Sequence, residues 1–208
     1  AFDQSPFIAE AVAEVRDAML EASVLVVAVI FVFLQGFRST LIPSLAIPVS
    51  VIATFGIIHF LGFTINNLVL MALTLTIGVV VDDAIIVLES AYRHMEEGKD
   101  RVTAAITASD EIAFPVIATT LTLVAVFVPI AFLGGTVGRF FFEFGITVAV
   151  AIFVSAFVAL TLTPMLCSRL LSLGTSASRP GVIGAVARGF DRSIERFSTH
   201  YERLLHTA

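Results

Sequence analysis

Apolar stretches of membrane-spanning length constrain the fold of this chain more than any other feature. A helix needs about 20 mainly apolar residues to cross a bilayer. Five stretches fit this requirement: residues 21–37, 41–63, 68–88, 112–133 and 140–167. Hydrophobic residues make up 58% of the chain and charged residues only 14%, whereas soluble domains contain about half and a quarter. The sequence therefore predicts an all-α membrane protein with five transmembrane helices in a bundle.

Two amphipathic segments flank this predicted transmembrane region, which covers residues 21–172. In residues 1–20, apolar and acidic residues recur at helical spacing on different faces, which predicts a lead-in helix outside the membrane. A Gly/Ser/Pro-rich linker, residues 173–181, precedes an apolar stripe flanked by arginines in residues 182–208. This last pattern predicts an amphipathic helix in the headgroup plane. A soluble surface helix packed on another domain is the alternative.

Lysine and arginine residues are unevenly distributed between the two sides of the five predicted spans. The poor side holds only Arg16 and Arg139. The rich side holds the basic segment 182–208 together with Arg38, Arg93, Lys99, Arg101 and Arg169. Because cytoplasmic loops carry the excess of positive charge, the rich side is predicted to be cytoplasmic. The lead-in helix is then periplasmic, and the 182–208 helix lies on the cytoplasmic surface.

A pair of acids, Asp82 and Asp83, interrupts the apolar run GVVVDDAIIVLES (78–90). An Asp near the bilayer centre costs on the order of 2.5–3.5 kcal/mol, and acids inside membrane segments generally mark functional sites. Apolar surroundings and a neighbouring carboxylate both favour the protonated form, so two adjacent acids should titrate as a coupled pair. The pattern predicts a proton-relay site that couples protonation to transport. A buried salt bridge with a structural role is the alternative.

Other polar residues near this pair are weaker candidates. Glu89 lies seven residues after Asp82, on the same helix face and toward the cytoplasm, while Thr119 and Thr122 offer hydroxyls on the fourth span. Threonines in membrane helices commonly bond their own backbone or join helices instead. Gly78, four residues before Asp82, would let a neighbouring helix approach.

Other classes of function use similar residues. An intramembrane aspartyl protease also needs two carboxylates, but they must face each other, which adjacent residues on one helix do not easily do. A ring of acids in an oligomeric cation channel is a further alternative. No Ser/His pair, metal-ligand cluster or phosphate-binding Gly-rich loop stands out in the sequence. The chain is therefore predicted not to be an enzyme, and to use no cofactor, metal ion or nucleic acid.

Several motifs together resemble one family, the resistance–nodulation–division (RND) exporters of the hydrophobe/amphiphile type from Gram-negative bacteria. They are FLQGFRSTLIPSLAIPVSV (33–51), GFTINNLVLMALTLTIGVVVDDAIIVLES (62–90), VFVPIAFLGGTVGRFFFEFGITV (126–148) and ALTLTPMLCSRLL (159–171). The resemblance runs nearly end to end and corresponds to membrane helices two to six plus the cytoplasmic surface helix. It implies that Asp82 and Asp83 match the relay aspartates of this family.

The resemblance further implies proton-driven export of drugs or other amphiphiles across the bacterial inner membrane. Full-length members work as homotrimers with a periplasmic adaptor and an outer-membrane channel. The porter regions, the second half and the relay lysine of the family have no counterpart in these 208 residues, so the sequence is expected to be a piece of a longer chain. A heavy-metal cation exporter and a protein-translocation accessory of the same superfamily are alternatives, although the acid doublet favours organic substrates.

Overall fold

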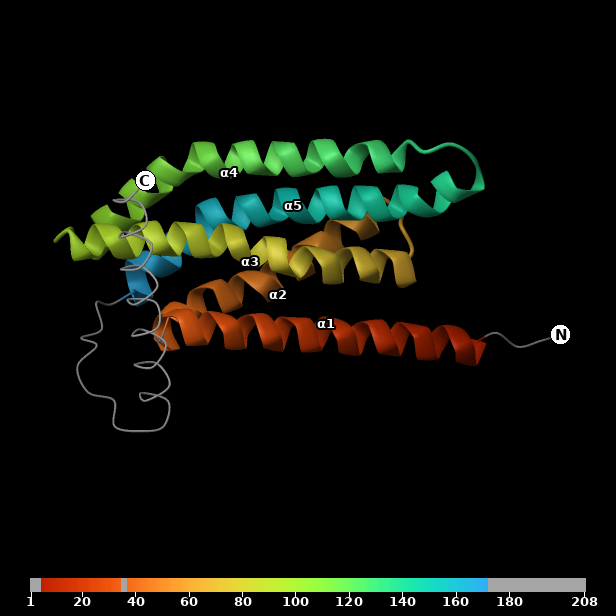
Figure 1. Cartoon of the computed structure of the whole chain (residues 1–208), viewed down its shortest axis with the longest axis horizontal. Helices are drawn as coiled ribbons and strands as arrows, with labels where there is room; N and C mark the ends of the chain where they lie inside the picture. The colour runs from red at the N-terminus through yellow and green to blue at the C-terminus, as the bar shows by residue number, and fades with distance from the viewer. Residues whose placement is uncertain (1–4, 35–36, 172–208) are drawn as a thin grey trace, which may run out of the picture. The chain divides into compact units, whose positions relative to one another are not determined.

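The computed structural model describes residues 5–34 and 37–171, and all its regular elements there are α-helices. In chain order they are α1 (Ser5–Leu34), α2 (Phe37–Phe60), α3 (Asn67–Glu96), α4 (Arg101–Ala131) and α5 (Gly135–Leu170) (Figure 1). Four segments are long and apolar enough to cross a membrane: Phe37–Phe60, Asn67–Glu96, Arg101–Ala131 and Phe140–Leu170. These residues thus form an all-α membrane protein, as predicted.

Two parts of the predicted organisation are not tested by this architecture. The lead-in helix and most of the first predicted span, 21–37, form the single helix α1, which is not among the four candidate spans. The predicted linker and surface helix, 173–208, lie outside the described residues. A total of five spans therefore stays a prediction.

The helices α3 and α5 form the centre of the bundle. α3 contacts each of the other four helices, and α5 packs against α2, α3 and α4; Figure 1 shows α5 running beside α4. α4 is the least buried of the four candidate spans. Most of its apolar surface faces outward, which lipid tolerates because acyl chains are as apolar as the side chains.

Small side chains allow neighbouring helices to approach each other. A methyl group added at Gly145 of α5 would lie 3.0 Å from the carbonyl oxygen of Phe127 and 3.1 Å from the backbone nitrogen of Ala131, both on α4. Membrane helices gain their packing through such small residues. One buried cluster joins α2, α3 and α5 in the same way and consists of Ala46, Ala84, Val154 and Val158.

Short connections join α2 to α3 and α3 to α4, and the helix that follows each connection has a side-chain N-cap. Asn66 is the N-cap of α3: its Oδ1 accepts a hydrogen bond of 3.0 Å from the backbone nitrogen of Val69. The amide nitrogen of the same side chain donates to Glu143 at the start of α5. At the other end, Gly98 takes a φ of 95°, and Asp100 caps α4 by accepting from two backbone N–H groups.

Candidate functional site

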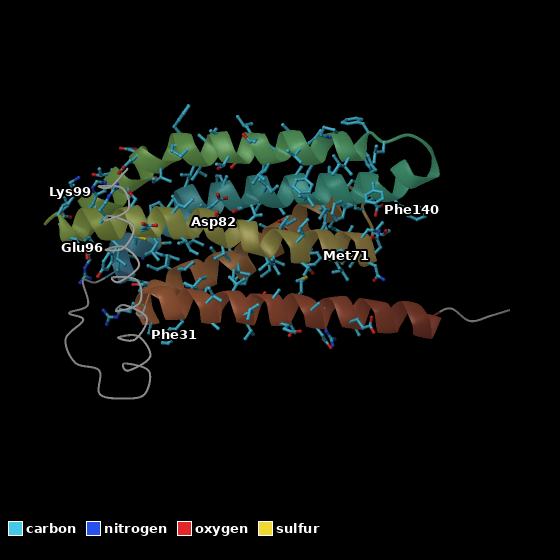
Figure 2. All side chains as sticks on the ribbon, in the orientation of Figure 1. Phe31, Met71, Asp82, Glu96, Lys99 and Phe140 are labelled. Carbon is cyan, nitrogen blue, oxygen red and sulfur yellow. The ribbon has the colours of Figure 1, made fainter. Side chains whose placement is uncertain are left out.

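Asp82 and Asp83 lie near the middle of α3 but on different faces of the helix. Asp83 is buried, with 8% of its surface exposed, whereas Asp82 is exposed. Figure 2 shows Asp82 at mid-helix, between Met71 and Glu96. Successive residues of an α-helix point about 100° apart, so the inward direction of Asp83 turns Asp82 outward. The predicted pair is therefore one buried acid beside one outward acid.

Asp83 is held by a hydroxyl from another helix. Ser155 Oγ of α5 donates a hydrogen bond of 2.7 Å to Asp83 Oδ2, and it also lies 3.2 Å from the carbonyl oxygen of Val80. Ser155 is itself buried. Ser155 is not predictable from local spacing, because its partner lies 72 positions away. The available signal was a lone hydroxyl in the apolar run AIFVSAFVAL (151–160).

No cation pairs with either acid within residues 5–34 and 37–171, because none of the ion pairs found there includes Asp82 or Asp83. The charge that acts on Asp83 is that of Asp82. A structural salt bridge, the alternative role for these acids, would need a cationic partner, and the described helices provide none. A buried carboxylate without a cation is costly when ionised. Binding a proton removes that cost, so the arrangement is chemically suited to take up and release protons.

The structure does not bring the accessory candidates to the acid pair. Thr119 and Thr122 are exposed on α4, and each donates its hydroxyl hydrogen to a backbone carbonyl of its own helix. Glu89 is exposed on α3. Within the described part of the chain, none of these three side chains is hydrogen-bonded to Asp82 or Asp83. Their participation in a proton relay stays a prediction.

Gly78 does not have the role expected for it. Nothing in the described helices lies within 4 Å of a methyl group built at this position, so no neighbouring helix approaches there. The expectation of a close approach at Gly78 was wrong for these helices. The close approach occurs at Gly145 instead, where α5 meets α4.

A second polar cluster joins the end of α3 to the start of α4. Arg93 Nη2 lies 2.6 Å from Glu111 Oε1, and the ring of His94 lies between Glu111 (2.9 Å) and Glu97 (3.0 Å). The hydrogen bond with His94 is the main reason why the pKa of Glu97, just beyond the end of α3, lies below its ordinary value. The charge of Glu89 also acts on Arg93. This cluster fastens two helices at one end of the bundle.

Metal ions have no evident site in the parts of the chain that the structure describes. No group of three or more His, Cys, Asp or Glu side chains there is arranged to hold one. Cys167 is buried and free, in a cluster with Ala91, Met95 and Leu171. Cys167 thus packs as a small buried apolar side chain.

Comparison with known proteins gives matches over the whole chain. A family model described as the AcrB/AcrD/AcrF family matches residues 1–208. The multidrug resistance protein MdtC of Pantoea ananatis (strain AJ13355) is 47% identical over 204 residues. Proteins of the same name from Pectobacterium atrosepticum and Pectobacterium carotovorum subsp. carotovorum are 45% identical over 204 residues. Each match covers 95% of this chain and 20% of the relative, so the chain spans about a fifth of their length.

Proposed function

Because the chain belongs to the AcrB/AcrD/AcrF family, we propose that it is the proton-relay part of a transporter that exports drugs or other amphiphiles in exchange for protons. The resemblance to RND multidrug exporters is confirmed by the family match and by the relatives. The chain is a multi-pass protein of the bacterial inner membrane. The mechanism of export, its substrates and its partners are part of the proposal.

The observation that carries the proposal is the buried carboxylate of Asp83, which has a hydroxyl partner and no cation in the described helices. In the proposed mechanism, Asp83 and its neighbour Asp82 bind a proton from the periplasmic side and release it to the cytoplasm. Moving one elementary charge across the membrane potential supplies about 2.3 kcal/mol per 100 mV. That energy would shift the helix bundle between two conformations that expose the acids to opposite sides.

The finer topology belongs to the same proposal. The second half of α1 would be a fifth span, because Val24, Leu25 and Val29 are exposed while Ile30 packs on α3 against Ile77. Exposed apolar side chains on one face and packed ones on the other suit a helix between lipid and protein. The periplasmic lead-in, the cytoplasmic-surface helix, the homotrimer and the adaptor and outer-membrane partners complete the proposed pump.

The geometry favours transport over the alternative uses of two acids. A protease dyad requires two carboxyl groups that face each other across a water molecule, whereas Asp83 points to α5 and Asp82 points outward. A channel would show flux proportional to the driving force, whereas a carrier would show saturable turnover with coupled proton uptake. The names of the relatives, multidrug resistance proteins, support organic substrates over heavy-metal cations.

The test replaces each acid by its neutral isostere in a full-length transporter that carries this segment. We expect Asp82→Asn and Asp83→Asn each to abolish dye export while membrane insertion is preserved. The matched control is Asp110→Asn, the same chemical change at an exposed acid of α4, which should export dye at the unmodified rate. Export by either Asp82→Asn or Asp83→Asn at the rate of this control would refute the proposal.

A further inference from the structure

Ser155 is placed to serve both charge states of Asp83. We propose that Ser155 is a positioning residue for the proton step, and that its single hydroxyl hydrogen moves between Asp83 and the carbonyl of Val80 as Asp83 loses and gains a proton. This inference rests on the proposed function, because it concerns the acid that would carry the proton.

The geometry offers the hydroxyl two acceptors. Ser155 Oγ lies 2.7 Å from Asp83 Oδ2 and 3.2 Å from the carbonyl oxygen of Val80, but a serine hydroxyl has one hydrogen to donate and two lone pairs to accept with. When Asp83 is ionised, the hydrogen points to Oδ2 in a charge-assisted bond. When Asp83 is protonated, its own O–H can donate to Ser155 Oγ, and the serine hydrogen turns to Val80. Only one O–H rotates, and no covalent bond of serine changes.

This exchange keeps every polar group paired in a dry environment. Ser155 is 1% exposed, and it lies next to Val154, which packs with Ala84 in a buried apolar cluster. An unpaired buried donor or acceptor costs about 1–3 kcal/mol. A partner that could serve only the ionised acid would therefore penalise the protonated one. A partner that serves both lets the acid change charge without moving the helices first.

Ser155 differs from most hydroxyl residues of the described helices, although Ser90 of α3 also donates to another helix, at 3.3 Å from Glu111 of α4. In α2, Ser44 and Thr54 donate to carbonyls of their own helix, at 2.7 Å from Thr40 and Ser50 respectively, which is the usual arrangement in membrane helices. Ser155 instead reaches from α5 to α3 and contacts two groups of that helix. Both contacts of its hydroxyl are therefore with α3: one with the carboxylate of Asp83 and one with the backbone of the preceding turn.

Few charged groups compete for Asp83 in the described helices. Asp82 is the neighbour that acts on it electrostatically. The charged and titratable residues of the helices packed against α3 lie in α1 or toward the ends of α2, α4 and α5. Those whose side chains the structure describes are Glu14, Arg16, Asp17, Glu21, Arg38, His59, Arg101, Asp110, Glu111, Glu143, Cys167 and Arg169. A change at Ser155 should therefore act on the titration of Asp83 directly.

Infrared spectroscopy of a full-length transporter that carries this segment tests the inference. The carbonyl stretch of protonated Asp83 is identified by its loss in Asp83→Asn. In Ser155→Ala we expect this band to move to higher wavenumber, because its hydrogen bond is lost. We expect its pH midpoint to rise by about one pH unit, because the charge-assisted hydrogen bond lost from the ionised acid is stronger than the neutral one lost from the protonated acid. Ser155→Thr keeps the hydroxyl and should restore band and midpoint, and Ser44→Ala should leave both unchanged.

Two results would overturn the role of Ser155. One is a band and midpoint in Ser155→Ala identical to those of the unmodified transporter. The other is an equal change in Ser155→Ala and Ser155→Thr, which would assign the effect to packing. Both results are distinguishable from failure of the proposed function, in which Asp83→Asn itself would export dye normally.

Discussion

Alanine at Gly145 and alanine at Gly78 should change the stability of the bundle in opposite directions. Each substitution removes a glycine from a helix interior, which favours the helix by about 1 kcal/mol. At Gly78 the added methyl meets no atom of the described helices within 4 Å, so the gain is retained. At Gly145 it would lie 3.0 Å from the Phe127 carbonyl oxygen and 3.1 Å from the Ala131 nitrogen. These backbone atoms yield only if α4 moves, and such overpacking costs about 1–3 kcal/mol.

The helix-propensity gain is common to both variants, so the difference between them measures the steric cost alone. That difference should be about 2 kcal/mol, or a factor of roughly 30 in the ratio of folded to unfolded protein. The assay is unfolding of the chain by sodium dodecyl sulfate in mixed micelles, followed by far-ultraviolet circular dichroism. Equal unfolding midpoints for the two variants would mean that α5 does not approach α4 at Gly145.

Two further predictions concern the helix caps. Hydrogen bonds with the side chain and backbone of Thr103 lower the pKa of Asp100. The ionised carboxylate therefore stabilises α4 at any pH above the ordinary pKa range of aspartate. This stabilisation is lost as the pH falls through the lowered pKa. Amide-exchange protection at Thr103 should therefore drop in acid, but not in Asp100→Asn, whose cap does not titrate; parallel behaviour would contradict this. Asn66→Ala removes the cap of α3 and should lower the stability by about 1 kcal/mol, measured by thermal unfolding in detergent; an unchanged midpoint would contradict the capping role.

The apolar spans could be predicted from the sequence, but the start of α4 could not be placed by hydropathy. The predicted spans end at residue 88 and resume at residue 112, whereas α3 continues to Glu96 and α4 begins at Arg101. The local signals were present: a glycine at 98, a capping aspartate at 100, and small residues at helical spacing. Ala104, Ala105 and Ala108 are buried against α3 and α5, so tertiary packing stabilises turns that are too polar to count as a span.

Of the candidate site, only the two acids could be predicted from the sequence. Asp82 and Asp83 stand out because an apolar run gives no local reason for a carboxylate. Which of the two faces inward depends on where α5 packs, and so does the choice of Ser155 as partner. Both are long-range properties that no spacing encodes. Thr119 and Thr122 show the opposite error, in which a candidate from the sequence makes no contact with the site. Their hydroxyls donate to carbonyl oxygens of the preceding helical turn, and the sequence alone does not distinguish such a hydroxyl from one that reaches another helix.

The outward direction of Asp82 has a consequence for biogenesis. Wherever this face meets lipid before the rest of the protein packs on it, an ionised carboxylate at mid-depth would add about 2.5–3.5 kcal/mol to the free energy of the bundle. This free-energy cost is removed when a polar or cationic surface covers Asp82. Copies in which Asp82 stays uncovered would keep this cost, so the residue that would handle protons would also make the stability of the inserted bundle depend on complete assembly.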